Sequence, residues 1–425
     1  MRTVAAAAAL LALAAPSPVL AEGLYIAAGR LLDVKSGEML TGQCILTDGE
    51  RIVRIETCAA IPEGTTRVDW SAYTVLPGLI DLHTHLSDTG SSADLSDPLK
   101  TSPVETVLIG ARNARLTLEA GFTTVRDVGT YRGLTDVALR NAIDRGLVPG
   151  PRMFVAGAYL THPGGGGELN GVVPNDQLPA DMRLGVLSSP GEAAARAAYL
   201  FDNGVDFLKL MATGAVLAIG TEPGEPELTE AEMRAAIEVA KARGSFATAH
   251  AHGAEGIKAA IRAGVRSIEH ASLIDEEGLL LAREKGVWLV MDIYNGDYID
   301  TVGSAEGWPE EYLRKNRETT QVQRDAFRRA VELGVPLAYG TDAGVFPHGL
   351  NARQFRYMVA NGMTPLQAIW AATVNAARVL GRDAELGRIA PGYLADMIAV
   401  EGNPLAEIAV LERVSAVIKG AQIVR

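Results

Sequence analysis

Apolar and polar residues alternate along the middle of the chain in a pattern that predicts strands followed by helices. Short apolar runs, the candidate strands, are Leu79–Leu82, Thr123–Asp127, Arg152–Ala156, Phe207–Met211, Phe246–Ala249, Ser267–Glu269, Trp288–Met291 and Pro336–Tyr339. Helical periodicity lies between them, at Glu105–Ala120, Glu192–Asn203, Glu230–Arg243, Ala254–Ala263, Glu276–Lys285 and Arg317–Leu333. Strands that alternate with helices in this way are typical of an α/β fold, a (β/α)8 TIM-like barrel, here over 77–380.

Both ends of the chain carry a different pattern, short β-type runs separated by turn residues. These runs are Leu24–Ala27, Gln43–Thr47, Ile52–Ile55 and Arg67–Asp69 near the start, and Asp396–Val400, Ala416–Lys419 and Gln422–Val424 near the end. Neither piece is long enough to bury a core alone. We therefore expect one small β-sandwich domain built from 22–76 and 381–425, with the barrel inserted between them.

Three segments that follow candidate strands are expected to be long loops: Ser87–Pro103, His162–Arg183 and Asn295–Asn316. Loops at the C-terminal ends of barrel strands build active sites in this fold class. Gly164–Gly167 resembles a phosphate cradle, but it lacks the Lys and Ser/Thr that follow in a P-loop. A flexible lid or a pocket wall is the expectation there.

Bulk composition narrows the functional classes. The 425 residues are 48% hydrophobic and 21% charged, and the net charge is −12. An acidic chain is a poor match for nucleic acid, whose phosphates require Lys- and Arg-rich surfaces. The apolar run Val4–Ala15, with small residues Val19 and Ala21 before Glu22, predicts a cleaved signal peptide over 1–21 and export to the periplasm or medium. No later run is long enough to span a membrane.

The chain has two cysteines, Cys44 and Cys58. An exported protein could join them, but Asp48-Gly49 reads as a tight hairpin turn that places Cys44 opposite about Val53. Cys58 would then lie too far along the strand for a bridge. We expect two free structural cysteines.

Histidine placement carries the strongest chemical signal. Of seven histidines, six fall at or just after candidate strand ends, namely His83, His85, His162, His250, His252 and His270. Residues i and i+2 of a strand point to one face, so His83 and His85 can reach one ion. Neutral imidazole suits zinc or a similar divalent cation. A lone histidine would more often be a satisfied core residue, and His348 is expected to shape the pocket rim without binding metal.

Two further residues fit a metal site. Lys209 lies inside an apolar run, where a buried amine is costly and must be paired or neutralised. A neutral lysine can add CO2 to give an anionic carbamate that bridges two cations, although an outward-pointing lysine in a salt bridge is an equal alternative. Asp342 follows the last strand, where it could bind a metal and accept a proton, or cap the next helix.

The motif His83-Thr84-His85 after Pro77-Gly78, together with Lys209, His250, His270 and Gly-Thr-Asp342, resembles the binuclear amidohydrolase superfamily in order and strand number. The similarity extends over about 24–425 and is greatest to the imidazolonepropionase-like branch, with its Xaa-Pro and Xaa-Arg dipeptidases and ochratoxin-degrading amidases. It implies that His83, His85 and Asp342 hold one divalent ion, His250 and His270 a second, and carboxylated Lys209 bridges them with a shared hydroxide. Zinc and a homo-oligomer are also implied.

The resemblance further implies roles in catalysis and substrate binding. Asp342 would shuttle the proton, while His162 and His252 would contact the substrate carbonyl or carboxylate, or orient a ligand instead. Tyr294 would bind substrate or only pack. The expected activity is hydrolysis of an acyclic amide, a dipeptide or an N-acyl amino acid. A cyclic amidohydrolase and a non-catalytic metal-binding protein are the alternatives.

Overall fold

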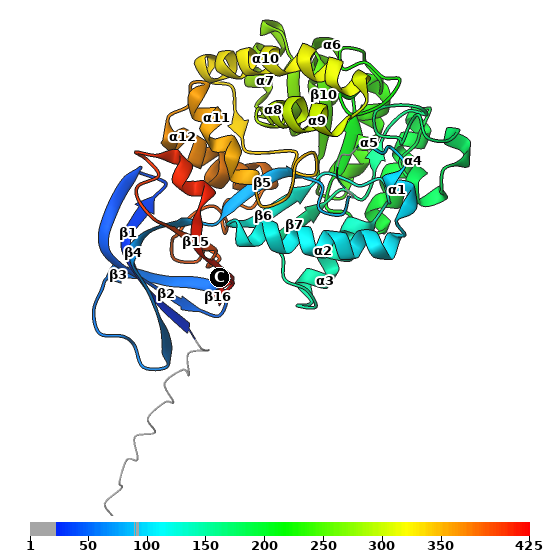
Figure 1. Ribbon diagram of the computed structural model, residues 1–425. Helices are drawn as coiled ribbons and strands as arrows, with labels where there is room; N and C mark the ends of the chain where they lie inside the picture. The colour runs from blue at the N-terminus through cyan, green and yellow to red at the C-terminus, as the bar shows by residue number, and fades with distance from the viewer. Residues whose placement is uncertain (1–22, 89, 91–92) are drawn as a thin grey trace, which may run out of the picture.

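The computed structural model describes residues 23–88, 90 and 93–425 (Figure 1). The predicted signal peptide, 1–21, lies outside these residues. No helix in the described part of the chain is both long and apolar enough to cross a membrane.

The central strands run parallel in a closed ring. They are β5 (Leu79–Thr84), β6 (Phe122–Asp127), β7 (Arg152–Val155), β8 (Tyr159–Leu160), β9 (Leu208–Met211), β10 (Ala247–Gly253), β11 (Ser267–Leu273), β12 (Trp288–Val290) and β13 (Leu337–Ala338). Two sheets, ordered β5-β6-β7 and β13-β12-β11-β10-β9-β8, make up the ring. Backbone bonds join them, because Leu82 N donates to Tyr339 O at 2.9 Å and Asp206 N donates to Val155 O at 2.8 Å. β7 and β8 are thus two halves of the third barrel strand.

Helices pack around the ring. The longer ones are α2 (Pro103–Glu119), α3 (Thr135–Asp144), α4 (Pro190–Asp202), α5 (Glu230–Ala242), α6 (Ala254–Ala263), α7 (Glu276–Lys285) and α10 (Glu310–Leu333). A last group precedes the C-terminal strands: α11 (Gln354–Ala360), α12 (Pro365–Trp370), η5 (Ala371–Asn375) and α13 (Ala376–Leu380). Short turns complete the set: α1 (Asp97–Lys100), η1 (Asn175–Gln177), η2 (Ala180–Arg183), α8 (Asn295–Tyr298), η3 (Ile299–Gly303), α9 (Ser304–Glu306), η4 (Asn351–Arg353) and η6 (Ile408–Glu412).

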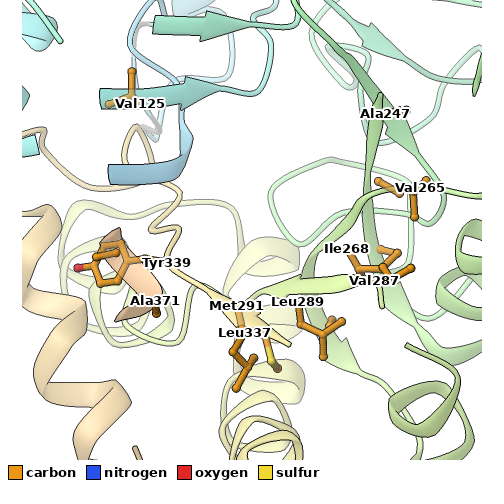
Figure 2. Packing of buried hydrophobic residues seen from close by; sticks show 14 of the residues in the cluster. Val125, Ala247, Val265, Ile268, Val287, Leu289, Met291, Leu337, Tyr339 and Ala371 are labelled. Carbon is orange, nitrogen blue, oxygen red and sulfur yellow. The ribbon is translucent and has the colours of Figure 1, made fainter. Parts of the chain in front are cut away.

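Apolar side chains hold strands and helices together. Figure 2 shows part of this core, where Ile268 of β11, Leu289 of β12 and Leu337 of β13 belong to one buried cluster with side chains from neighbouring strands and helices. Tyr339 stacks on Phe122 with ring centroids 5.8 Å apart. The barrel is therefore a packed core, and its open end is free to carry chemistry.

The two ends of the chain form one seven-stranded sheet beside the barrel (Figure 1). Its strands are β1 (Gly23–Asp33), β2 (Glu38–Asp48), β3 (Arg51–Thr57), β4 (Thr65–Pro77), β14 (Met397–Val400), β15 (Val414–Lys419) and β16 (Gln422–Ile423). β14 pairs antiparallel with β4 and so joins both ends. Ile26, Ile45, Val75, Met397 and Ile418 are fully buried in a core of their own.

The prediction of a loop over Asn295–Asn316 is wrong. The segment is mostly helical, with α8, η3 and α9 in succession, and α10 begins at Glu310. At the start of α10 the apolar face is interrupted by Lys315, a charged residue that is fully buried. Its Nζ is 2.6 Å from Glu311 Oε1 and donates to Ala218 O at 2.7 Å.

The expectation of two free cysteines is also wrong. Cys44 and Cys58 form a disulfide, with Cα atoms 4.9 Å apart. The hairpin of β2 and β3 turns later than the sequence indicates, since Asp48 itself pairs with Arg51, and a bulge adds one more residue to β3. Cys44 therefore faces Glu56, only two positions from Cys58.

Reduction of this disulfide should destabilise the protein. The cysteines are separated by 14 residues, and closing a loop of about 15 residues stabilises a fold by roughly 3 kcal/mol. We expect a reductant to lower the Tm measured by calorimetry. The Cys44→Ser/Cys58→Ser double variant should start at the lower Tm and show no response to reductant. An unchanged Tm of the reduced wild type would contradict the stabilising role.

Candidate metal centre and active site

The C-terminal ends of the barrel strands bring distant polar side chains to one pocket. β5 and the residue after it carry His83 and His85, β9 carries Lys209, β10 carries His250 and His252, β11 carries His270, and Asp342 follows β13. All seven side chains line the same pocket. Six of them are the residues expected to hold metal, and the seventh is His252.

One group of ligand atoms is formed by His83, His85 and Asp342. Asp342 Oδ1 is 3.3 Å from His83 Nε2 and 3.2 Å from His85 Nε2. The other ring nitrogens are held from behind, His83 Nδ1 by Glu269 Oε2 at 3.0 Å and His85 Nδ1 by Gly129 O at 2.9 Å. Such backing fixes each imidazole so that Nε2 faces the centre.

A second group is formed by His250, His252 and His270. One nitrogen of each lies within 4.8 Å of the others. Asp292 Oδ1 is 2.9 Å from His270 Nδ1, and Gln323 Nε2 donates to the same oxygen at 3.0 Å. His252 Nδ1 is 2.8 Å from Ser272 Oγ. The structure thus places His252 among possible ligands as well as beside the pocket.

These donors fit divalent cations. Imidazole nitrogens and carboxylate oxygens in groups of three are a ligand set for such ions. His83 Nε2 is buried and makes no hydrogen bond to any other described residue. A buried polar atom without a hydrogen bond is costly, and coordination of a cation would satisfy it. The clusters therefore indicate divalent-metal binding.

Burial sets the protonation of the site. Desolvation, followed by neighbouring positive groups, holds the pKa values of His250 and His252 well below their usual range. Burial opposes protonation of His85 too, but hydrogen bonding and charge attraction from Asp342 raise its pKa to about 9. A cation between His85 and Asp342 would take the place of that proton.

Lys209 lies at the base of the pocket, paired in register with Thr248 of β10. Its side chain is almost fully buried. Desolvation lowers its pKa to about 8, against the attraction of Glu269 and Asp342. A substantial neutral fraction of the amine therefore exists near neutral pH, which is the form that reacts with electrophiles.

Local backbone distortion turns key side chains inward. His270, Ala271 and Asp342 have φ values of 69°, 51° and 60°, in the left-handed region that non-glycine residues rarely adopt. In a regular strand Glu269 and His270 would point to opposite faces. The distortion at His270 lets both side chains reach the interior, and such strain is typical of functional sites.

Sequence reasoning missed the carboxylates that support the histidines. Glu269 accepts from Arg126 Nη2 at 2.6 Å and from Ser267 Oγ at 2.9 Å, beside its contact with His83. The sequence does contain a signal for Asp292, because this residue comes just after β12, in the position that the histidines occupy at the ends of other strands. Glu269 gave a weaker signal, a charged residue next to His270 in an apolar strand.

The structure does not bring His162 or Tyr294 to this pocket. His162 follows β8, but its Nε2 is 3.0 Å from Glu232 Oε2 on α5, and its side chain is 33% exposed. Tyr294 is buried, and its hydroxyl accepts from Arg353 Nη1 at 3.0 Å. Neither lines the pocket among the described residues. Glu232 of α5 and Arg353 of η4 thus engage the two side chains that were expected to contact substrate.

His348 also differs from its expected place at the pocket rim. It is buried, with Nδ1 3.4 Å from Thr117 Oγ1 of α2. Desolvation lowers its pKa to about 3, although its hydrogen bond to the His85 backbone opposes this. His348 is therefore a buried, neutral imidazole that lies against the His85 backbone.

The glycine-rich segment after β8 forms a pocket wall through Gly166. Two carboxylates hold its backbone, since Gly164 N donates to Glu168 Oε2 and Gly166 N to Glu227 Oε1, both at 2.7 Å. Glu168 is in turn bound by Arg183 Nε at 2.7 Å. The segment is thus anchored to the protein by its amides, without the lysine of a phosphate cradle.

Glu227 should make stability depend on pH. Burial raises its pKa from 4.5 to about 7, against its hydrogen bonds from Gly166 and Thr161. The folded state therefore retains a proton that the unfolded state loses, so stability falls as pH rises from about 4.5 to 7. Glu227→Gln keeps an acceptor and cannot ionise. Calorimetry should find nearly equal Tm values near pH 4 and a variant Tm about 2 °C higher at pH 8.

Glu225→Gln is the matched control, because Glu225 is an exposed carboxylate on the same segment. Its Tm should follow the wild type at every pH. A Glu227→Gln variant that is less stable than the wild type at pH 8 would show that the ionised carboxylate stabilises the loop.

A parallel barrel whose mouth gathers imidazoles around a carboxylate is a scaffold for hydrolysis assisted by divalent metals. Comparison with known proteins agrees with this interpretation of the site. The chain is 32% identical to ochratoxinase of Aspergillus niger over 408 residues, 91% of this chain and 83% of that protein. It is 25% identical to imidazolonepropionase of Streptomyces coelicolor over 373 residues, 84% of this chain and 85% of that protein.

Among solved structures, a Xaa-Pro dipeptidase with bound methionine in its active site superposes with a TM-score of 0.88 at 37% identity, over 95% of this chain and 99% of that chain. Residues 74–424 match the amidohydrolase family. The chain belongs to the amidohydrolase family, as the sequence predicted, and is a metal-dependent enzyme. The fold is that of this family, a TIM barrel with a β-sandwich.

Proposed function

We propose that this enzyme hydrolyses the amide bond of a dipeptide or an N-acyl amino acid with two divalent metal ions. The observation that carries the proposal is the meeting of two histidine-containing ligand groups with buried Lys209 in one pocket. The relatives add support, since one is a Xaa-Pro dipeptidase and another an ochratoxinase. A cyclic amide is less favoured, because identity to imidazolonepropionase is only 25%.

The residues that would hold the ions divide by strand. His83, His85 and Asp342 would hold the first ion, and His250 and His270 the second, with carboxylated Lys209 between them. When bound, two ions, for which we propose zinc, supply Lewis acidity to the substrate carbonyl and a nucleophile at neutral pH. His83 and His270 are kept in place by Glu269 and Asp292 from behind.

Asp342 would move the proton. Its carboxylate lies between His83 and His85, and these neighbours hold its pKa well below the usual range even though burial opposes this. An ionised carboxylate in the pocket can accept a proton from the attacking water and deliver it to the leaving amine. Its second oxygen, Oδ2, accepts from Asn295 Nδ2 at 3.2 Å, which fixes the orientation of the group.

His252 would orient the substrate. Its ring stacks on that of His270 at 4.7 Å, and Ser272 holds Nδ1. When the Ser272 hydroxyl donates to Nδ1, the proton of the neutral ring lies on Nε2, which can then donate to the carbonyl or carboxylate of a substrate in the pocket. This role is compatible with its neutral state, which follows from the lowered pKa.

The Cys44–Cys58 disulfide supports the proposal of export, because disulfides persist in oxidising compartments. A periplasmic or secreted dipeptidase or amidase would meet its substrates outside the cytoplasm. The disulfide lies in the sheet of the chain ends, on β2 and beside β3, so it adds stability away from the pocket.

Asp342→Asn should separate metal binding from proton transfer. The amide keeps an oxygen between His83 and His85 but cannot take a proton. We expect much of the bound metal to remain, measured by elemental analysis, and kcat for a hydrolysed dipeptide to fall by at least about a hundredfold. Turnover within a few-fold of the wild type would discard the proton-transfer role.

Lys209 should make metal reconstitution depend on bicarbonate and pH. Enzyme stripped with a chelator and given zinc in CO2-depleted buffer should regain little activity until bicarbonate is added. Recovery should be faster at pH 9 than at pH 7, because the neutral amine increases as pH passes the Lys209 pKa of about 8. Lys209→Met should show no response to bicarbonate. Full recovery of wild type without CO2 would exclude the carbamate.

A further inference from the structure

The pocket contains a carboxylate that the proposed metal centre does not use. Three aspartates line it, Asp88, Asp292 and Asp342. Asp292 is engaged by His270 and Gln323, and Asp342 by His83 and His85. Among the described residues, the hydrogen bonds of the Asp88 side chain are longer ones, with the hydroxyls of Tyr159 and Thr130 both at 3.4 Å, together with a backbone bond from Tyr131.

Asp88 is not needed to orient the imidazole of His85, the nearest basic side chain. His85 Nδ1 is 4.0 Å from Asp88 Oδ2 but only 2.9 Å from Gly129 O and 3.0 Å from the Tyr159 hydroxyl. The imidazole therefore already has closer partners. Within the described lining of the pocket, Lys209 is the only lysine or arginine, and the proposed function gives it another role.

Two aromatic residues line the pocket together with this carboxylate. Tyr131 and Tyr159 both line the pocket, and their ring centroids are 5.6 Å apart with an interplanar angle of 72°. Aromatic faces attract cations, and a neighbouring carboxylate adds direct charge attraction. Asp88, Tyr131 and Tyr159 thus have the chemistry of a small site for an ammonium group. We call these three residues the cation subsite.

Barrel topology places the cation subsite on one side of the mouth. Asp88 follows β5, Tyr131 follows β6 and Tyr159 belongs to β8, so the three residues come from the first three barrel strands. On the opposite strands, the Asp292 carboxylate is engaged by His270 and Gln323, and the other polar groups include the uncharged Ser272 and Asn295. A substrate centred on the ligand groups would extend one end toward the carboxylate and the other toward uncharged donors.

Electrostatics explains why an amine would need such a site. Two divalent ions held by Asp342 and a lysine carbamate, with neutral histidines, leave the centre net positive. A protonated amine bound beside it would be repelled unless a negative group accompanied it. Asp88 supplies that group in a pocket with little exposure to water, its side chain being 14% exposed.

We infer that Asp88, with Tyr131 and Tyr159, binds a protonated amine of the substrate, so that the enzyme prefers amides with a free ammonium group to their N-acylated forms. This inference rests on the proposed function and selects within it a dipeptide over an N-acyl amino acid. The amine can be the N-terminus or a basic side chain, which share the same chemistry.

The test compares the zinc-loaded wild type with Asp88→Asn on matched substrates. Ala-Phe and N-acetyl-Ala-Phe differ in the N-terminal charge, and Ala-Lys and Ala-norleucine differ in the side-chain charge. We expect Asp88→Asn to lower kcat/KM at least about tenfold for Ala-Phe, mainly through KM, and by less than about twofold for N-acetyl-Ala-Phe. A loss confined to Ala-Lys relative to Ala-norleucine would assign the subsite to a basic side chain.

An equal loss on all four substrates would overturn the inference, because it would show that Asp88 acts through His85 and the metal. Asp97→Asn on α1 is the matched control, since it removes the same charge outside the pocket lining. Metal content should be equal in the three proteins.

A binding measurement separates this inference from the proposed function. Calorimetry with alaninamide and N-acetylalaninamide needs no turnover. We expect the wild type to bind alaninamide more tightly, and Asp88→Asn to lose the difference. Equal affinity of the wild type for both probes, together with equal losses of Asp88→Asn on Ala-Lys and Ala-norleucine, would overturn the inference, even if dipeptides are hydrolysed. Absence of hydrolysis with preserved discrimination between the probes would overturn the proposed function alone.

Discussion

One buried carboxylate links four strands beneath the pocket. Glu269 of β11 binds Arg126 of β6 at 2.6 Å, contacts His83 of β5 at 3.0 Å and bonds to Thr248 of β10. Arg126 and Glu269 are both fully buried, so removal of either would leave an unpaired charge in the interior, a change that typically costs 3–5 kcal/mol. The position of the first ligand group, and hence of the reaction, depends on this pair.

The pattern of the chain was sufficient to predict the barrel, the strands at its centre and the gathering of the histidines, because a parallel barrel directs all strand ends to one face. It could not predict what depends on local departures from that pattern. His270 reaches the pocket beside Glu269 only because of its left-handed backbone, which strand alternation excludes. The bulge in β3 likewise shifted the register and joined Cys44 to Cys58.

Contacts between side chains that are distant in the sequence could not be predicted from the sequence pattern either. His162 ends a barrel strand as the ligand histidines do, yet its imidazole turns to Glu232, which also caps α5 through Thr229. Thr229 and Glu232 have the spacing of a capping box, but the further bond from Glu232 to a histidine 70 residues away leaves no local sequence signal. Strand position indicates which residues can reach a barrel mouth, and neighbouring charges then decide which do.

The charged side chains are distributed unevenly around the pocket. Asp342 and Lys209 lie at its base, near the ligand groups, whereas Asp88 stands on the side of the first three strands with Tyr131 and Tyr159. The strands across the mouth offer amide and hydroxyl groups, and their one carboxylate in the described lining, Asp292, is engaged by His270. Such asymmetry orients a substrate before any bond changes, because only one end can carry the positive charge toward Asp88. Orientation of this kind converts binding energy into placement of the scissile carbonyl at the metal centre.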